Sequence, residues 1–279
     1  MNSINSVIIP IAGKGTRFLP VTKTITKTMF PIINKPVLHY LLEEALNAGL
    51  TNIYIVINEE QEMIKNYLDT NSKYYEDLIK EYDELNNLHD ILSKVKITYV
   101  IQDKPRGLGD AIYRCKDYIK GSFAVMLGDD LVLSNTDKYG IYDLVDKYKE
   151  SPNNYLGVKE VEEKETSKYG IVKLNGDVVV DMVEKPKTNP PSNYAAVGRY
   201  VFNNTIFDYL STIKDDGINE IQLTDAIVKA INEEEVRIVN FSGTRFDIGD
   251  HAGYVLANIY ASLKDNIIKE KITDFIKII

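Results

Sequence analysis

Cysteine and tryptophan are nearly absent from this chain, which has one cysteine and no tryptophan among its 279 residues. The single cysteine, Cys115, excludes an internal disulfide, and without a CxxC pair it offers no thiolate metal site. We therefore expect Cys115 to be a buried free thiol without a chemical role.

Long hydrophobic runs are also missing. No stretch approaches the roughly 18 uncharged apolar residues of a membrane-spanning helix, and the start, MNSINSVIIPIAG, lacks the basic region of a secretion signal. The formal net charge of −8 disfavours a surface for nucleic acid or anionic membranes, which requires clustered basic residues. A composition of 44% hydrophobic and 27% charged residues is typical of a globular protein. We expect a cytoplasmic protein with one domain over residues 1–279.

Acidic residues are missing from the N-terminal segment, although the chain contains 41 of them. The first is Glu43, and five basic residues precede it: Lys14, Arg17, Lys23, Lys27 and Lys35. Two interpretations are open. Either the basic side chains are solvated surface groups, or the segment forms a small site for an anion; the glycines among them favour the site.

Apolar strands that alternate with amphipathic helices predict an α/β fold for the first half of the chain. Strands are predicted at 6–13, 52–58, 95–102 and 122–130, and helices at 35–50 and 109–119. The first of these make a βαβ unit, so ligands are expected at the carboxyl edge of the first strand. Residues 59–94 are charged and aromatic with helical periodicity, which predicts a peripheral helical insertion. Residues 1–131 are thus expected to form a Rossmann-like, doubly wound nucleotide-binding half.

The pattern changes after residue 131. Short alternating segments interrupted by Gly and Asn predict a smaller antiparallel β lobe over residues 132–249. Helices are predicted at 219–235 and in the C-terminal segment 250–279, with a strand at 236–243 between them. No repeat, low-complexity segment or long linker divides the chain.

The segment IPIAGKGTRFLPVTK has the composition of an anion-binding loop. Glycine permits close approach and positive φ, so Gly13 and Gly15 can turn successive N–H groups toward an anion. Arg17 can hold phosphate oxygens in a fork, and Lys23 and Lys27 would share one side if the segment is helical. The segment is neither a Walker A loop nor a dinucleotide fingerprint. It favours an oligophosphate ligand, and a tight turn with solvated lysines is the alternative.

Two adjacent carboxylates, Asp129 and Asp130, follow an apolar strand in VMLGDDLVL. Burial of such a pair is costly unless a cation neutralises it. Mg²⁺ takes one or two carboxylates and fills its other positions with water and phosphate oxygens, so the pair is a candidate magnesium site. A solvated Asp-rich turn is the alternative. In FDIGD, Asp247 is a further carboxylate that could complete the metal shell.

A third candidate is the pair Glu184 and Lys185 in VEKPK, where a proline follows directly. Such a pair could bind sugar hydroxyls and a second phosphate. The alternative is an exposed ion pair at the end of a strand.

In order along nearly the whole chain, these segments resemble the sugar-phosphate nucleotidyltransferases. The GxGTR…K loop is typical of that superfamily. The segments TRFLPVTK, GRYVF and EIQLTDAI, with the helical insertion, are similar to its uridylyl branch, the bacterial UTP:glucose-1-phosphate uridylyltransferases. The resemblance implies formation of UDP-glucose and pyrophosphate from UTP and glucose 1-phosphate, with Mg²⁺ as cofactor, in a homodimer or homotetramer.

The resemblance also implies roles for individual residues. Catalytic positions are matched by Arg17, Lys27, Asp130 and Lys185. Nucleotide-binding positions are matched by Ala12, Gly13, Gly15, Lys23, Gln102, Gly107 and Asp129. Sugar-phosphate positions are matched by Gly170, Glu184, Lys185 and Gly198, and metal ligands by Asp130 and Asp247. The reaction needs no protein nucleophile or base, so the histidines at 39, 89 and 251 are expected to be structural.

Four positions depart from the family pattern. Thr26 stands where a proline is usual, Thr28 and Asn34 where acids are usual, and Asp110 where GLGH has histidine. We expect the first change to free the backbone before Lys27 and the loss of acids to leave the loop more basic. Another sugar 1-phosphate or dTTP is an alternative substrate. A non-catalytic regulatory protein that binds sugar nucleotides is an alternative from another class, although retention of the four catalytic matches argues against it.

Overall fold

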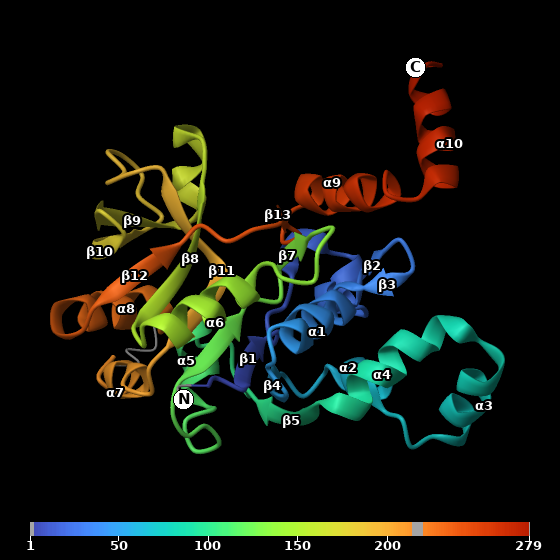
Figure 1. Cartoon of the computed structure of the whole chain (residues 1–279), viewed down its shortest axis with the longest axis horizontal. Coiled ribbons are helices and arrows are strands. Elements are labelled where there is room, and N and C mark those ends of the chain that lie inside the picture. The colour runs from blue at the N-terminus through green and yellow to red at the C-terminus, as the bar shows by residue number, and fades with distance from the viewer. Residues whose placement is uncertain (1–2, 214–219, 279) are drawn as a thin grey trace.

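The apolar run near the start of the chain forms strand β1 (Ser6–Pro10), which lies inside a large mixed sheet (Figure 1). The computed structural model describes residues 3–213 and 220–278. β1 is parallel to β4 (Asn52–Ile57) and β6 (Phe123–Met126), and β4 is parallel to β5 (Lys96–Ile101). The predicted doubly wound α/β fold is confirmed.

The strands of the second half continue this sheet rather than forming one of their own. The long strand β11 (Tyr194–Phe202) pairs antiparallel with β6 on one side and with β8 (Asn154–Glu160) on the other. Within the described ranges the order is β5-β4-β1-β6-β11-β8-β12-β10-β9. The remaining strands of this sheet are β9 (Gly170–Asn175), β10 (Val178–Glu184) and β12 (Val236–Val239), of which β12 runs parallel to β8. The alternating pattern predicted the strands but could not show that β11 joins them to the parallel half.

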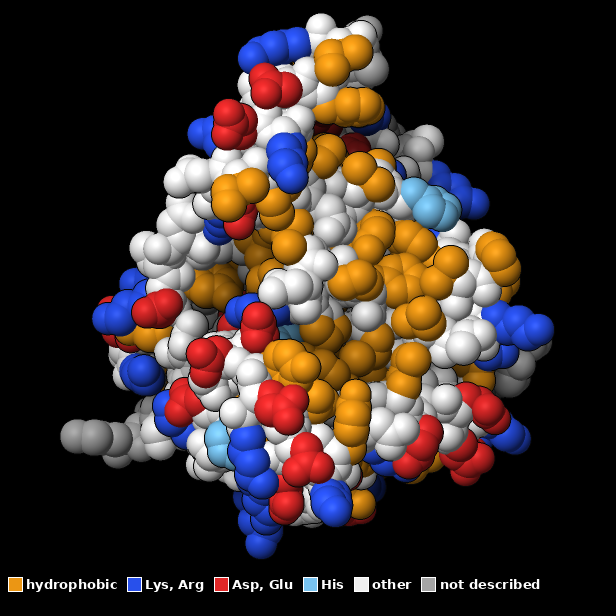
Figure 2. Space-filling view, turned by 90° about the vertical axis from the view of Figure 1, so that its right-hand side faces the viewer, with side chains coloured by type: hydrophobic (Ala, Val, Ile, Leu, Met, Phe, Trp, Pro, Cys, Tyr) orange, Lys and Arg blue, Asp and Glu red, His pale blue; other side chains and the backbone are white. Residues whose placement is uncertain are grey.

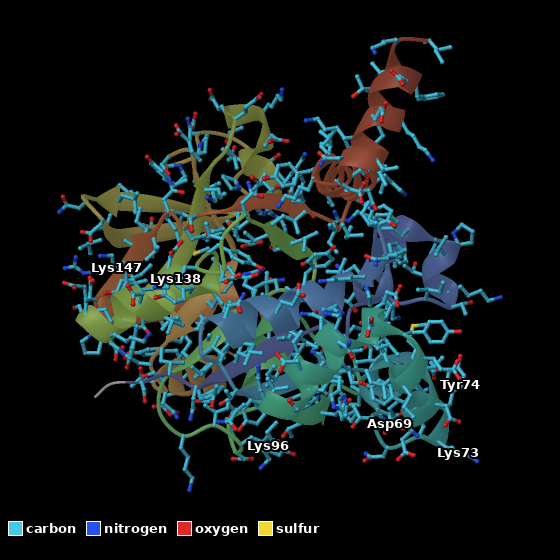
Figure 3. The ribbon with its side chains drawn as sticks, turned by 45° about the vertical axis from the view of Figure 1, so that its right-hand side comes forward. Asp69, Lys73, Tyr74, Lys96, Lys138 and Lys147 are labelled. Atoms are coloured by element: carbon cyan, nitrogen blue, oxygen red, sulfur yellow. The ribbon has the colours of Figure 1, made fainter. Side chains whose placement is uncertain are left out.

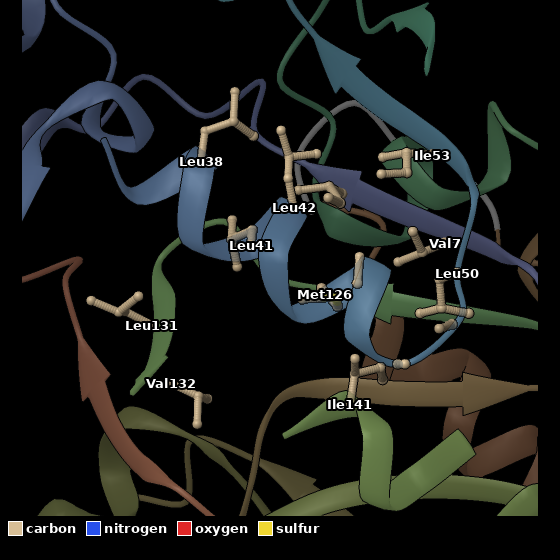
Figure 4. Close-up of a cluster of buried hydrophobic side chains, with 14 of the residues drawn as sticks. Val7, Leu38, Leu41, Leu42, Leu50, Ile53, Met126, Leu131, Val132 and Ile141 are labelled. Carbon is tan, nitrogen blue, oxygen red and sulfur yellow. The ribbon is translucent and has the colours of Figure 1, made fainter. Parts of the chain in front are cut away.

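Helices cover both faces of the sheet, as in a doubly wound fold. One face packs against α1 (Val37–Asn47), α4 (Asn86–Lys94) and α6 (Ile141–Glu150), and the other against α5 (Leu108–Tyr113), α7 (Ile206–Ser211) and α8 (Leu223–Glu233). Adjacent residues of β1 serve opposite cores, because successive strand side chains point to opposite faces. Figure 4 shows Leu38, Leu41 and Leu42 of α1 pointing into the first core. Each such buried side chain contributes about 1.5–3 kcal/mol.

The predicted strand at 122–130 ends at Met126, and the two aspartates lie in the turn after it and at the start of β7 (Asp130–Leu133). β7 pairs antiparallel with β13 (Thr244–Asp247) in a separate ribbon. The turn has no room for a side chain, because a Cβ at Gly128 would lie 2.4 Å from Cγ2 of Ile11. The sequence could not show this crowding.

The insertion contains the expected helices, α2 (Glu62–Leu68), α3 (Lys73–Glu81) and α4, at the outer edge of the molecule. Figure 3 shows Asp69, Lys73 and Tyr74 at this edge, and Tyr74 is 74% exposed. Within the described residues no helix is long and apolar enough to cross a bilayer.

Several predicted elements differ in length from those observed, among them β1, which ends at Pro10 rather than 13. The C-terminal helix is two helices, α9 (His251–Ser262) and α10 (Asn266–Ile276), because Asp265 caps α10 by accepting hydrogen bonds from the N–H groups of Ile267 and Ile268. Helix α5 ends at Tyr113 rather than 119, and β12 ends at Val239 rather than 243. The predicted helix at 219–235 is α8, and position 219 lies outside the described residues.

Candidate active site

The glycine loop after β1 presents unpaired backbone donors. Within the described ranges, the N–H groups of residues 12–15 donate no hydrogen bond. Gly15 adopts φ +62°, and the hydroxyl of Thr22 donates to its carbonyl at 2.9 Å. Four successive free donors around a residue of positive φ make a concave site for an anion. The geometry supports the anion interpretation of the loop.

The basic segment after the loop is not one helix. It forms three single turns, Thr16–Phe18, Val21–Lys23 and Lys27–Met29, separated by extended backbone at Thr26. Lys23 and Lys27 would share one side only if the segment were helical, and that condition is not met. The reason is that the insertion holds Thr26: its N–H contacts Sδ of Met63 at 3.4 Å, and its hydroxyl accepts from Gln61 at 2.9 Å.

Three adjoining cavities run along the carboxyl edge of the parallel strands, where ligands of open α/β sheets bind. The outer cavity, about 520 Å³, is lined by Ala12, Gly13, Lys14, Lys23, Asn58 and Gln102. The middle slot, about 340 Å³, is lined by Gly13, Lys27, Gln102, Gly107, Leu108 and Asp129. The inner cavity, about 250 Å³, is lined by Arg17, Asp130, Gly170, Glu184, Lys185 and Gly198. The structure thus places the predicted site residues, except Gly15, in the linings of three adjoining cavities.

Lys27 and Asp129 form an ion pair where the middle slot meets the inner cavity, with Nζ to Oδ2 at 2.5 Å. Burial raises the pKa of Asp129, but the Lys27 ammonium outweighs that effect and holds the pKa below its usual value. Asp129 is therefore an anion whose positive partner also faces the cavities. Gly13 lines the same slot, so the Lys27 ammonium and the glycine loop both face it.

Asp130 is buried beside a cation that the sequence analysis did not single out. Arg245 of β13 forms an ion pair with Asp130 and lies 3.8 Å from Asp247. Its guanidinium also packs over the ring of Tyr169, 4.9 Å from the centroid, and Nη1 donates to the Tyr169 hydroxyl at 3.1 Å. Burial and the nearby Asp129 raise the pKa of Asp130, and Arg245 opposes that rise.

The carboxylates of Asp130 and Asp247 fit a Mg²⁺ site by their chemistry. The two residues are paired across the β7–β13 ribbon, and the guanidinium of Arg245 interacts with both carboxylates. Two carboxylates this close together require a positive charge beside them. No three His, Cys, Asp or Glu side chains of residues 3–213 and 220–278 could enclose a metal by themselves. That is consistent with an ion that takes most of its ligands from water and phosphate.

Two glycines make room for these carboxylates. Gly198 has φ +54°, and a Cβ there would lie 2.3 Å from Oδ2 of Asp130. A Cβ at Gly249 would lie 2.9 Å from Oδ1 of Asp247, 3.3 Å from Oδ2 of Asp129 and 3.5 Å from Nη1 of Arg17. Gly249 therefore lies where three predicted site residues converge. The sequence analysis missed it, although it stands two residues after Asp247 in FDIGD.

A buried ion pair lies directly behind Asp130. Arg199, which is fully buried, donates to both carboxylate oxygens of Glu44 at 2.7 and 2.6 Å. The same guanidinium donates to the carbonyl oxygens of Gly198 and Asp130, each at 2.9 Å. This pair connects α1, β11 and β7 around the candidate metal ligand. A charged residue inside the apolar pattern LHYLLEEALN was the sequence signal for Glu44.

Glu184 and Lys185 lie in the wall of the inner cavity, which Gly198 and Asp130 also line. The Lys185 ammonium is 3.1 Å from Oε1 of Glu184 and its side chain is 58% exposed. Oε2 of Glu184 accepts from the hydroxyl of Thr224 in α8 at 2.6 Å, a contact that the sequence analysis missed. A Cβ at Gly170 would lie 3.1 Å from Oε2 of Glu184 and 2.3 Å from the methyl of Met182, so a side chain would crowd this carboxylate.

The departures from the family pattern lie in different surroundings. Thr26 is held by the insertion, so the expectation of a freed backbone before Lys27 is wrong. Thr28 is fully buried, and its hydroxyl is the one buried side-chain polar atom without a partner in the described part of the chain. Asn34 is exposed and borders a separate cavity of about 900 Å³ between α1, α4 and the end of α9, which contains none of the predicted site residues. Asp110 lies beside Gln102.

The histidines and the cysteine lie outside the three cavities. His39 contacts Tyr67 and Asn87, and the ring of His251 packs at a tilt of 47° against Phe18, with 4.6 Å between ring centroids. His89 packs against Tyr75. Cys115 is a free buried thiol, as expected.

Comparison with known proteins agrees with this geometry. The family model described as nucleotidyl transferase matches residues 6–262. A UTP--glucose-1-phosphate uridylyltransferase 2 of Staphylococcus saprophyticus is 41% identical, and the match covers 99% of this chain and 98% of that one. A UTP--glucose-1-phosphate uridylyltransferase of Staphylococcus epidermidis is 40% identical and covered over 99% of both chains.

Solved structures agree in turn. A UDP-glucose pyrophosphorylase complexed with UDP-glucose has a TM-score of 0.85 at 35% identity, over 94% of this chain and 100% of that one. A UTP-bound UGPase from Acinetobacter baumannii has a TM-score of 0.88 at 31% identity, over 98% of both. The chain belongs to the nucleotidyl transferase family and, within it, to the UTP--glucose-1-phosphate uridylyltransferases, also called UDP-glucose pyrophosphorylases.

Proposed function

We propose that the protein transfers a uridylyl group from UTP to glucose 1-phosphate and releases pyrophosphate and UDP-glucose. The observation that carries the proposal is the order of features along the cavities: free N–H donors at the glycine loop, a slot with mostly apolar walls that ends at the Lys27–Asp129 ion pair, and a charged inner cavity. Full-length relatives named for this reaction support it. Mass spectrometry of UTP and glucose 1-phosphate incubated with the protein tests it, with UDP-glucose expected and its absence contradicting the proposal.

Positioning of two polyanions is the main task of such a site. An oxygen of the sugar phosphate attacks the α-phosphorus of UTP, and the bond from that phosphorus to the pyrophosphate oxygen breaks. The attacking phosphate is already ionised, so no proton has to be removed by the protein. Arg17, Lys23, Lys27 and the N–H groups of residues 12–15 offset the charge of the triphosphate, and Lys185 that of the sugar phosphate.

Lys27 has the central role in this mechanism. Its ammonium is 2.5 Å from Asp129, and it lines the slot that also holds Gly13. Asp129 directs it toward the position of the transferred phosphate. A cation fixed before substrate arrives needs no reorganisation as charge develops in the transition state.

We propose Mg²⁺ as the cofactor, held by Asp130 and Asp247. When bound, the ion would neutralise charge on the phosphates of both substrates. Arg199 holds the main chain at Asp130, and Gly198 leaves space for its carboxylate. Tyr169 donates to Asp247 at 3.4 Å.

The sugar is assigned to the inner cavity. Glu184, oriented by the Thr224 hydroxyl, can accept hydrogen bonds from sugar hydroxyls, while Gly170 and Gly198 leave room for the carboxylates of Glu184 and Asp130 in the same lining. The division into a nucleotide-binding half (1–131), a sugar-binding lobe (132–249) and a C-terminal helical segment (250–279) is part of this proposal, as is a cytoplasmic location.

We propose a homodimer or homotetramer, because apolar side chains are exposed on the surface around α9 and α10. The exposed apolar side chains here come from the basic loop (Leu19, Val21, Ile25, Ile33), from α9 and its end (Val255, Leu256, Ile259, Leu263) and from α10 (Ile267, Phe275, Ile276). Figure 2 shows apolar side chains gathered on this face below the projecting C-terminal helix. Helix α10 buries none of its residues. A second copy of the chain would cover such a face, and light scattering during gel filtration tests this, with a monomer at all concentrations contradicting it.

A further inference from the structure

Asp110, one of the departures from the family pattern, is a buried carboxylate at the edge of the middle slot. Its side chain lies in the first turn of α5 and is 7% exposed. Oδ2 accepts a hydrogen bond from Nε2 of Gln102 at 2.8 Å and another from Nε of Arg114 at 2.9 Å. A carboxylate can only accept hydrogen bonds from such neighbours, which determines how they must be turned.

The amide of Gln102 is held in one orientation by its neighbours. Nε2 donates to the carboxylate of Asp110 and, at 3.1 Å, to the carbonyl oxygen of Gly107. Both partners are acceptors, so the amide nitrogen must face them. If the amide turned over, two hydrogen bonds would be lost and Oε1 would face two other oxygens.

The remaining polar atom of the Gln102 side chain is Oε1, which can only accept. No side chain or backbone group of the described residues donates to it. The N–H of Gly107 likewise donates to no described residue. Gln102 and Gly107 both line the middle slot, which therefore offers a ligand one fixed acceptor and one donor.

The position of this pair along the site suggests what it meets. The middle slot has a basic end, formed by the free N–H groups of the glycine loop and by Lys27, whose ammonium also pairs with Asp129. Glu220 lines the slot beside Gly107, and most of the other walls, including Leu108, are apolar. A nucleotide with its phosphates at the basic end would place its flat base against the apolar walls. The edge of that base would then meet Gln102 and Gly107.

We propose that Asp110 is a positioning residue that makes Gln102 select a base with an N–H beside a carbonyl, as in uracil or thymine, over cytosine. This inference rests on the proposed function, because it takes the middle slot as the site of the base. Uracil and thymine present N3–H to the acceptor Oε1. Cytosine presents an unprotonated N3, so two acceptors would face each other without a hydrogen bond. Thymine has the same edge as uracil, so this device does not separate UTP from dTTP.

Arg114 stabilises Asp110 in this role. Besides its bond to Asp110, the guanidinium donates from Nη1 to the carbonyl of Ile101 at 3.1 Å and lies 2.5 Å from Oδ1 of Asp103. The charge of the buried Asp110 carboxylate is thereby paired, which a buried ion requires.

The test compares Asp110→Asn with the unchanged protein, using UTP and CTP with glucose 1-phosphate. The asparagine has nearly the same shape, but its amide can donate to Oε1 of Gln102, so the glutamine can turn over. We expect kcat/KM for UTP to fall about tenfold, mainly through KM, and the ratio of kcat/KM for UTP over CTP to fall by at least as much. Asp110→His keeps an acceptor for Gln102 and is expected to retain most of the ratio.

The matched control is Asp103→Asn, which changes the other carboxylate paired with Arg114, whereas the Gln102 amide donates to Asp110 and Gly107. It is expected to leave the ratio of UTP to CTP within about twofold. A folded Asp110→Asn protein with the original ratio would overturn the inference, because a purely structural role would change stability and not base choice.

A binding measurement on the unchanged protein covers the case in which Asp110→Asn does not fold. Calorimetry with UMP and CMP is expected to show UMP bound at least tenfold more tightly, and equal affinities would overturn the inference. Different results would contradict the proposed function and the role of Asp110. The absence of turnover with any nucleotide contradicts catalysis. Turnover without preference for UTP over CTP contradicts only the role of Asp110.

Discussion

Gly198 lies directly against the carboxylate of Asp130, so that a Cβ at position 198 would stand 2.3 Å from Oδ2. The glycine is in β11, which pairs antiparallel with β6, and Asp130 begins the strand after the turn that follows β6. The backbone of one strand thus defines the space for the candidate metal ligand of another. Its φ of +54° also disfavours any side chain at this position.

Gly198→Ala is expected to reduce pyrophosphate release at least about 100-fold, because the new methyl group displaces the Asp130 carboxylate. Unfolding in urea should also show a loss of about 1–3 kcal/mol from strain and overpacking. The matched control is Gly176→Ala, where φ is +66° but no atom lies within 4 Å of the new Cβ. That control should lose about 1 kcal/mol at most and keep full activity. Equal activity of both variants would contradict the role given to Asp130.

The buried pair of Glu44 and Arg199 predicts a large effect on stability. Arg199→Met leaves the carboxylate of Glu44 buried without its partner, and such changes cost about 3–5 kcal/mol. Urea denaturation followed by circular dichroism measures this loss. Activity should fall as well, because the carbonyl of Asp130 loses its donor.

The double replacement Glu44→Leu with Arg199→Met separates charge from packing. Without either charge, the free energy of unfolding should recover by about 2 kcal/mol or more relative to Arg199→Met alone. Activity should stay low, since the contact to Asp130 is still missing. Full recovery of activity would show that Arg199 has no positioning role.

Replacement of Thr28 is expected to leave the stability of the fold unchanged or to increase it. Its hydroxyl is buried and lacks a partner in the described part of the chain, so Thr28→Val removes a desolvated polar group without removing a hydrogen bond. The variant should be as stable as the original protein, or more stable by about 1–2 kcal/mol, with unchanged kcat. A loss of more than about 1 kcal/mol would mean that the hydroxyl has a partner in solution.

Alkaline pH is expected to lower the free energy of unfolding, because some ionisable side chains are buried in their neutral forms. Burial raises the pKa of Cys115 from 9.0 to about 12, and burial together with Glu43 raises that of Tyr40 from 10.0 to about 12. The folded state therefore keeps both groups neutral while the unfolded state ionises, so their contribution is complete below pH 9 and is lost as the pH rises toward 12. The free energy of unfolding, measured in urea at pH 8, 10 and 11.5, should fall through this window. Cys115→Ala should show a smaller slope, and an identical slope would exclude the thiol as a cause.

The sequence predicted local structure well, because short patterns encode it. Apolar periodicity predicted β1, α1 and β4, and the glycine loop and GDD motif placed Gly13 and Asp130 at strand ends. Element lengths were less predictable. The end of α5 and the break before α10 depend on single turns and on the cap made by Asp265.

Contacts between distant segments could not be predicted from these patterns. Arg245 reaches Asp130 only because β13 pairs with β7, and Arg199 meets Glu44 across 155 positions of sequence. Thr224 orients Glu184 from another element. Such partners depend on the tertiary arrangement, and a lone arginine or threonine in the sequence gives no sign of it.

The most direct test of the account is pyrophosphate release by Lys27→Ala, with UTP and glucose 1-phosphate in the presence of Mg²⁺. Lys96→Ala is the control, since Lys96 is an exposed lysine at the start of β5, labelled in Figure 3 and distant from the cavities. The account predicts release by the original protein and by the control, and a fall of about 100-fold or more in kcat for Lys27→Ala. Release by Lys27→Ala at the original rate would contradict the assignment of the transferred phosphate to the space beside Lys27 and Asp129.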